Sequence, residues 1–214
     1  MARLITPDDF IENYTKLRQS GIGFISSKLN LNKVKSAKTA FNHLKIESAN
    51  WWIIPRVKER WNLLITGNQD LEPEKYILEN YLKGKKNLKM LSLGSGSCTS
   101  ELKFASHGNF CEILCVDIAD KLLGIAKVKA KKKGLNNIMF KVQNVNNFSY
   151  KEIYFDIIYF RSSLHHFKNV ESLVGDRLKK VLKKGGFLII DEYVGPSRLQ
   201  FPKHQIKAIN KAIK

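Results

Sequence analysis

The chain has 214 residues, of which 43% are hydrophobic, and 37 Lys and Arg against 19 Asp and Glu give it a formal charge of +18. This length accommodates one full domain and an appendage around a buried core, which excludes a disordered chain. No N-terminal apolar run is typical of a signal peptide, and no stretch approaches the roughly 20 apolar residues of a membrane span. We therefore expect a cytoplasmic protein that does not enter the membrane.

Charge and cysteine content limit the partners. Cys98, Cys111 and Cys115 form no CxxC pair and have no histidine at ligand spacing, so neither a disulfide framework nor a metal site is indicated. The positive charge would attract polyanions, which keeps RNA as a candidate partner. The lysines are spread along the whole chain, however, and 131–133 precede Gly134 as the end of a helix would. A solvated surface is the favoured interpretation.

Residues 1–84 predict a helical extension, or cap, joined to a domain over 85–214. Prolines at starts, glycines at stops and apolar residues at helical spacing predict helices from residue 6 onward and over 36–47, 57–65 and 73–82. Trp51, Trp52 and Trp61 allow two interpretations: they line an acceptor pocket, or they belong to the core, which is more usual for aromatic residues at helical spacing.

From residue 88 the pattern changes to short apolar strands separated by amphipathic helices. This alternation predicts a parallel, doubly wound, Rossmann-like α/β sheet covered on both faces. The expected strands are 89–93, 112–116, 138–142, 155–160 and 187–190.

The first strand ends in Gly94-Ser95-Gly96-Ser97, followed by a helix predicted over 97–107. Gly94 allows a sharp turn and Gly96 allows the backbone to approach a ligand closely, which is typical of a nucleotide site. The third glycine of the dinucleotide pattern is absent, because position 99 is Thr99. That spacing disfavours a pyrophosphate cofactor such as NAD.

Polar residues follow the later strands, where ligands of such sheets bind. Asp117 follows the second strand at the spacing of an acid that binds ribose hydroxyls. Its alternative role, a helix cap, suits Asp120 better. The third strand is followed by Gln143 and Asn144, whose amide oxygen suits an adenine amino group.

In this order and spacing, LSLGSGSC, CVDIADKLL, VQNVNNF, FDIIYFRSSLHHF and LKKGGFLIIDEYVG resemble the class I S-adenosylmethionine-dependent methyltransferases over about 88–195. The likeness looks closest to a bacterial branch with a tryptophan-rich N-terminal extension and an EYVGP segment. It implies that Gly94 and Gly96 face the methionine part of the cofactor, Asp117 the ribose, and Asn144 and Ile118 the adenine. The implied cofactor-binding residues are Ser92, Gly94, Ser95, Gly96, Asp117, Ile118, Asn144 and Arg161.

Three positions depart from the family pattern. Ser92 stands where an acid is usual, Cys98 where glycine is common, and Asn144 where Asp is common. Asn144 keeps an acceptor oxygen, and Cys98 is compatible with the fold if it is already helical.

The implied reaction needs an acceptor held in line with the activated methyl group, and positioning supplies about 7–11 kcal/mol of such a barrier. A hydroxyl acceptor also needs a base, for which His165 and His166 are the candidates and Glu192 the next. The alternative is that these imidazoles cap the next helix or pack under the cofactor. We expect methylation of a small-molecule or sugar acceptor, with oxygen favoured over nitrogen; the alternatives are an RNA-binding or RNA-methylating module and a non-catalytic relative.

After the fifth strand only a helical pattern remains, over 201–214. The two further strands of the resembling fold are therefore expected to be missing, which would leave 187–190 as an exposed apolar edge.

Overall fold

The computed structural model describes residues 54–147 and 152–192, together with six single positions, Phe10, Tyr14, Arg18, His204, Lys207 and Lys211. The helical patterns predicted from residue 6 onward and over 201–214 are described only at these six positions, each of which is helical. The helix predicted over 36–47, Trp51, Trp52 and the residues of the EYVGP segment after Glu192 lie outside the described residues.

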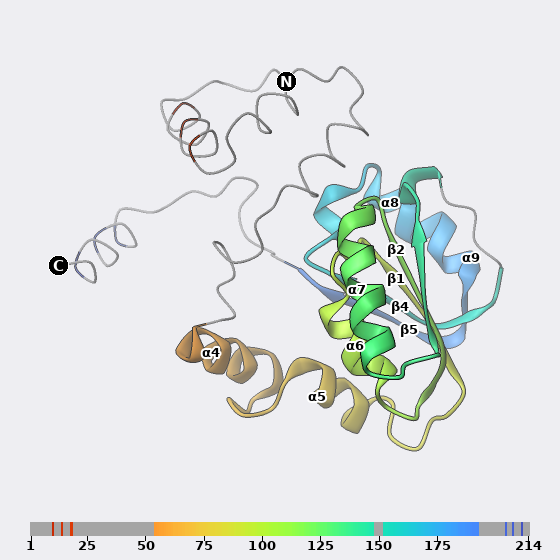
Figure 1. Ribbon diagram of the computed structural model, residues 1–214, viewed down its shortest axis with the longest axis horizontal. Helices are drawn as coiled ribbons and strands as arrows, with labels where there is room; N and C mark the ends of the chain where they lie inside the picture. Colours follow the sequence, from red (N-terminus) through yellow and green to blue (C-terminus); the bar gives the residue numbers. More distant parts are fainter. Residues whose placement is uncertain are drawn as a thin grey trace.

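Within residues 54–87, helices α4 and α5 precede the sheet (Figure 1). Helix α4 (Pro55–Thr66) ends at Gly67, whose φ of 77° suits a residue without a side chain. Helix α5 (Pro73–Asn80) also starts at a proline and directs Leu78 into the main core. The prediction that Trp61 belongs to the core is wrong, since its side chain is 42% exposed on α4. None of the described helices is long and apolar enough to cross a membrane.

Five parallel strands form one sheet in the order β3-β2-β1-β4-β5. The order reverses at β1, which pairs with both β2 and β4, so the chain winds outward in both directions. This confirms the predicted Rossmann-like fold. The strands are β1 (Leu88–Leu93), β2 (Phe110–Asp117), β3 (Ile138–Val142), β4 (Phe155–Arg161) and β5 (Leu182–Asp191).

Helices cover both faces of the sheet, as Figure 1 shows with α7 in front of the strands. The connecting helices are α6 (Thr99–Ala105), α7 (Asp120–Lys132) and a continuous helical segment of α8 (Val170–Ser172), a π-helical turn (Leu173–Leu178) and α9 (Lys179–Val181). Met90 and Ile113 face the larger core with α5, α6 and α7. Leu91 and Ile158 face the second core with the segment after α8. Successive strand residues serve opposite faces, which explains why the strands are apolar throughout.

Strand β5 begins five residues before the expected 187. Its pairing with β4 is irregular between Phe155 and Ile157, and the extra residues contain Gly185 at a φ of 77°. A glycine at positive φ accommodates such an irregularity. Of the expected apolar edge, Leu188 and Ile190 are exposed, whereas Phe187 and Ile189 pack against the core.

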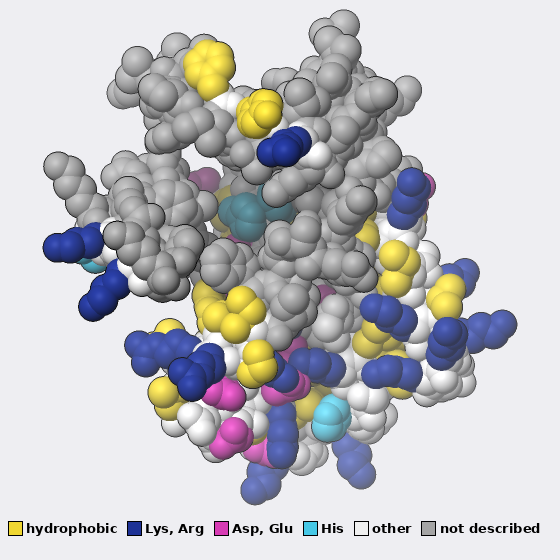
Figure 2. Space-filling view, turned by 60° about the vertical axis from the view of Figure 1, so that its left-hand side comes forward, with side chains coloured by type: hydrophobic (Ala, Val, Ile, Leu, Met, Phe, Trp, Pro, Cys, Tyr) yellow, Lys and Arg dark blue, Asp and Glu magenta, His cyan; other side chains and the backbone are white. Residues whose placement is uncertain are grey.

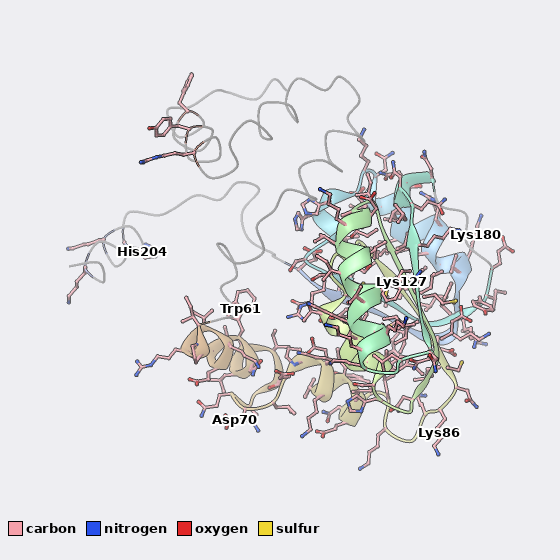
Figure 3. All side chains as sticks on the ribbon, viewed as in Figure 1. Trp61, Asp70, Lys86, Lys127, Lys180 and His204 are labelled. Carbon is pink, nitrogen blue, oxygen red and sulfur yellow. The ribbon has the colours of Figure 1, made fainter. Side chains whose placement is uncertain are left out.

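Basic side chains are distributed over the surface. Figure 2 shows Lys and Arg on several separate parts of one face of the molecule. In Figure 3, Lys86, Lys127 and Lys180 project from the segment before β1, from α7 and from α9. The described part of the chain therefore presents no single basic stripe across this face.

Candidate functional site

A cavity of about 1010 Å³ lies at the carboxyl ends of the strands, where the strand order reverses. Its walls come from the β1–α6 turn, the residues after β2, β3 and β4, and the start of the segment after α8. Lys58 and Glu72 add a contribution from α4 and the loop before α5. The structure thus brings the polar strand ends that the sequence singled out around one cavity.

The glycine turn, Gly94 to Ser97, forms part of the cavity wall. Gly94 has a φ of 69°, and its N–H donates to the Val116 carbonyl at 2.8 Å. A Cβ on Gly94 would lie 2.6 Å from the Cβ of Ser163, so this glycine also lets the loop after β4 approach β1. Gly96 has a φ of 53°, and a Cβ there would meet nothing within 4 Å.

Cys98 differs from its expected helical conformation. The residue has φ 53° and ψ 38°, in the left-handed region, and α6 begins after it at Thr99. The glycine-type backbone is therefore retained without the glycine. Left-handed geometry strains a residue that carries a Cβ, and the side chain of Cys98 is fully buried in the core, which holds it in place.

Asp117 joins the glycine turn to the end of β2. Its Oδ2 accepts the Gly96 N–H at 2.7 Å, and its Oδ1 accepts the Ala119 N–H at 2.7 Å. The side chain is buried and borders the cavity. The prediction that Asp120 caps the following helix is wrong: Asp120 is its first helical residue, and the residue at the cap is Ala119.

Two further predicted residues line the same side of the cavity. Ile118 follows Asp117 and is half-buried. Asn144 lies beyond β3, where its Oδ1 accepts the N–H of Asn146 at 3.0 Å and so closes a local turn. The amide oxygen is thus oriented by the backbone.

Ser92 is buried below the turn and is not among the described residues that line the cavity. Its hydroxyl donates to Glu101 Oε1 at 2.6 Å. Glu101, in the first turn of α6, does line the cavity, although sequence reasoning did not single it out. Burial raises the pKa of Glu101 to about 7, against the smaller opposing effect of the Ser92 hydrogen bond.

A second buried acid belongs to α5. Glu74 Oε1 lies 2.6 Å from Arg161 Nη1 and accepts the Ser100 hydroxyl at 2.6 Å, while Lys103 Nζ lies 3.2 Å from Oε2. Burial alone would raise the pKa of Glu74. The Ser100 hydrogen bond and the Arg161 charge together outweigh burial and hold this pKa below its usual range. Arg161, a predicted cofactor-binding residue, lines the cavity, and its guanidinium is paired with Glu74.

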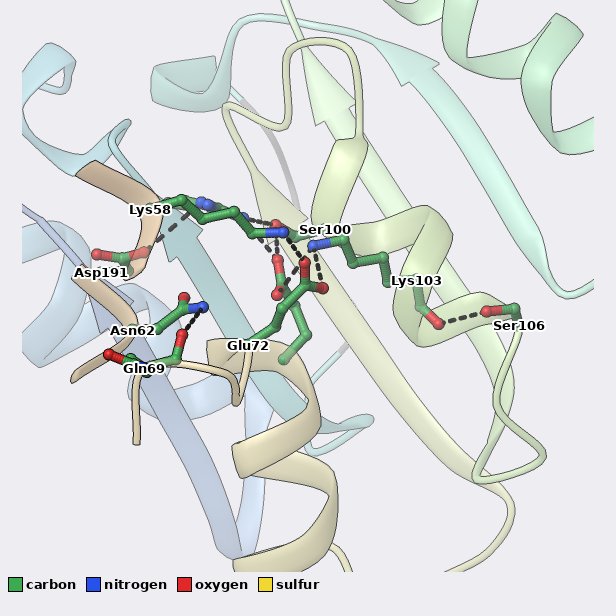
Figure 4. Close-up of polar contacts among 10 residues, drawn as sticks. Lys58, Asn62, Gln69, Glu72, Ser100, Lys103, Ser106 and Asp191 are labelled. Atoms are coloured by element: carbon green, nitrogen blue, oxygen red, sulfur yellow. Dashed lines mark hydrogen bonds and ion pairs between the residues drawn. The ribbon is translucent and has the colours of Figure 1, made fainter. Parts of the chain in front are cut away.

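Glu72 extends this polar cluster to α4 (Figure 4). It forms ion pairs with Lys58 and, at 2.8 Å, with Lys103. Hydrogen bonds from Lys103 and Lys58 lower the pKa of Glu72 to about 2. The residues before the sheet are therefore tied electrostatically to α6 beside the cavity.

The two histidines occupy different surroundings. His166 is an exposed residue that lines the cavity, and partial desolvation, with the adjacent His165 charge, lowers its pKa. His165 is exposed, and its Nδ1 lies 2.8 Å from Glu192 Oε2. Glu192 also accepts the backbone N–H groups of Ser163 and Leu164. Neither His165 nor Glu192 is among the described residues lining the cavity.

A parallel sheet with reversed strand order and a glycine turn and acid at its switch point defines the Rossmann-like class of nucleotide-binding folds. Residues 84–214 match the model of a family described as "Methyltransferase domain", and the chain belongs to that family.

The chain is also similar to individual proteins that are named as methyltransferases. The chain is 28% identical over 105 residues to the "Uncharacterized methyltransferase YcgJ" of Bacillus subtilis, which is 49% of this chain and 41% of that protein. It is 30% identical over 112 residues to the "Ubiquinone/menaquinone biosynthesis C-methyltransferase UbiE" of a Shewanella species, which is 51% and 44% of the two chains. The chain thus spans less than half the length of these relatives.

Among solved structures, an S-adenosylmethionine-dependent methyltransferase of Aquifex aeolicus superimposes with a TM-score of 0.51 and 21% identity. The match covers 69% of this chain and 74% of that one, and it supports the fold.

Proposed function

We propose that the protein is an S-adenosylmethionine-dependent methyltransferase that binds its cofactor at the glycine turn and Asp117. The observation that carries the proposal is the direct hydrogen bond between Gly96 and Asp117, which both line the cavity. Membership of the methyltransferase domain family supports it. When bound, S-adenosylmethionine supplies a methyl group that its sulfonium already activates.

The residues present fit this cofactor. Ser95 borders the cavity within the turn and carries a buried hydroxyl group. Gly96 presents open space where any other residue would place a Cβ. Asp117 would accept from the ribose hydroxyls, and Ile118 and Asn144 would contact the adenine.

The acceptor is proposed to be a small molecule. A cavity of about 1010 Å³ lies at the upper end of the roughly 300–1,000 Å³ that is typical of small-molecule sites. His166 is the candidate base, because it faces the cavity and its lowered pKa keeps the imidazole neutral near neutral pH. A neutral base serves an acceptor that must lose a proton, which favours a hydroxyl over an amine.

A carbon acceptor is the second candidate, supported by the relative named as a C-methyltransferase. A carbon acceptor, like a hydroxyl acceptor, must lose a proton when it is methylated. An RNA acceptor is disfavoured by the separation of the basic side chains in Figures 2 and 3. Steep loss of RNA affinity with rising salt would support it instead.

The remaining assignments stay predictions. These are the division of the chain at residue 84, a cytoplasmic location, which the free cysteines favour, and the bacterial branch with the EYVGP segment. The alternative of a truncated, non-catalytic relative predicts that the cofactor binds weakly or not at all.

Calorimetry with S-adenosylhomocysteine tests the cofactor site. Asp117→Ala is expected to lose binding, whereas Asp120→Ala, which changes an exposed residue, is expected to retain it; equal affinities in both variants would refute the assignment.

Transfer of a labelled methyl group to a panel of small acceptors then tests the proposed base. His166→Ala should lose activity on hydroxyl acceptors, whereas His107→Ala, on an exposed turn, should not.

A further inference from the structure

Glu101 is a buried acid at the wall of the cavity. Its side chain is 3% exposed, and Ser92 supplies its one side-chain hydrogen bond among the described residues. The charge of Arg161 lowers the pKa of Glu101, but by less than burial raises it. A carboxylate in such surroundings is costly unless a cation reaches it.

Glu74 provides the internal comparison, because it is buried to the same degree. Arg161 at 2.6 Å and Lys103 at 3.2 Å neutralise it. Only Glu101, however, is among the residues that line the cavity. Glu74 is therefore paired directly with two cations, whereas Glu101 borders the cavity.

We propose that Glu101 binds the α-ammonium group at the methionine end of the cofactor, with Ser92 holding the carboxylate in position. This inference rests on the proposed cofactor site. Glu101 lines the same cavity as Gly94 and Gly96. A buried carboxylate and an ammonium group form a charge-assisted hydrogen bond, which is stronger than a neutral one. The acid thereby selects for ligands that carry the amino-acid portion as well as the nucleoside.

The test uses two uncharged-sulfur ligands that share the thioadenosine part. S-adenosylhomocysteine carries the ammonium group, and 5′-methylthioadenosine lacks the amino-acid portion. By calorimetry, Glu101→Gln is expected to lower the affinity for S-adenosylhomocysteine by at least about tenfold. The affinity for methylthioadenosine should fall by less than about twofold. Glu59→Gln, which removes an exposed acid of α4, is the control for lost charge and is expected to change neither affinity.

A second readout uses the unaltered protein. Because the ammonium favours the ionised acid, affinity for S-adenosylhomocysteine should rise about eightfold between pH 6 and 7.5, given a Glu101 pKa of about 7. Glu101→Gln should remove this rise. Any pH dependence of affinity that remains in the variant measures the contribution of His166 and is subtracted.

The groups that face Glu101 do not obscure this readout. The pKa of Glu74 on α5 is lowered, whereas those of Tyr159 and Arg161 on β4 and of Cys115 on β2 are raised, so all four titrate outside the window.

The outcomes separate the two proposals. Two results would refute the role of Glu101 without refuting the cofactor site. One is an equal loss of affinity for both ligands in Glu101→Gln, and the other is an affinity for S-adenosylhomocysteine that does not change with pH in the unaltered protein. Failure of the unaltered protein to bind either ligand would overturn the cofactor site and this inference with it.

Discussion

Replacing Glu101 by glutamine removes a buried carboxylate while keeping the shape of the side chain and an oxygen that accepts from Ser92. The exchange therefore isolates the cost of the charge in the ligand-free protein. The folded-state pKa of about 7 lies above the ordinary value of 4.5. The folded state thus binds this proton more tightly, so its stabilising effect is complete below pH 4.5 and is lost as pH rises through about 7.

The magnitude follows from the two pKa values. Raising a pKa from 4.5 to about 7 corresponds to roughly 3 kcal/mol at high pH, of which about 2 kcal/mol develops between pH 5.5 and 7.5. The free energy of unfolding of the unaltered protein should therefore fall by about 2 kcal/mol relative to Glu101→Gln across that interval. The variant should be the more stable protein at pH 7.5.

Urea titrations at several pH values measure this difference. Glu59→Gln is the matched control, because it removes an exposed carboxylate and should follow the unaltered protein at every pH. Parallel stability curves for the unaltered protein and Glu101→Gln would show that the buried acid carries no such cost. Adding S-adenosylhomocysteine should narrow the gap at pH 7.5, since the proposed ammonium contact would neutralise the carboxylate.

Three other predictions concern the same region. Gly94→Ala should lower the free energy of unfolding by at least about 2 kcal/mol, because its Cβ would lie 2.6 Å from that of Ser163; a stability change below half of that would contradict the packing argument. Gly96→Ala should cost only about 1 kcal/mol in stability yet weaken S-adenosylhomocysteine binding, and calorimetry showing unchanged affinity would place this turn away from the ligand. Glu74→Gln should destabilise by about 3–5 kcal/mol, because it leaves the half-buried Arg161 without its nearest acid; urea unfolding of the single and double exchanges with Arg161→Met measures the coupling, and independent effects would refute it.

Ion pairs connect the residues before the sheet to the wall of the cavity. Glu72 and Glu74 flank the first residue of α5 and pair with Lys58, Lys103 and Arg161, three cations that line the cavity. Leu78 and Leu82 meanwhile belong to the core beneath the sheet. Helix α5 is thus part of the framework that holds the cavity wall.

Local patterns in the sequence determined the architecture. Apolar runs of strand length alternating with helical periods require a parallel sheet, and Gly94, Gly96 and Asp117 follow their strands at a spacing that brings them together whenever that sheet forms. The observed strands match the expected ones within two residues, except at β5, where an irregular pairing near Gly185 adds residues that periodicity does not reveal.

Only the tertiary structure decided which polar groups meet. Glu74 and Arg161 are 87 residues apart, and Ser92 and Glu101 belong to different elements, so no periodicity links them. A turn of three residues places His166 in the cavity wall and His165 beside Glu192, and the sequence does not show this difference. Secondary structure follows from short-range patterns, whereas burial and charge pairing depend on how strands and helices stack, and those contacts form only when distant segments pack.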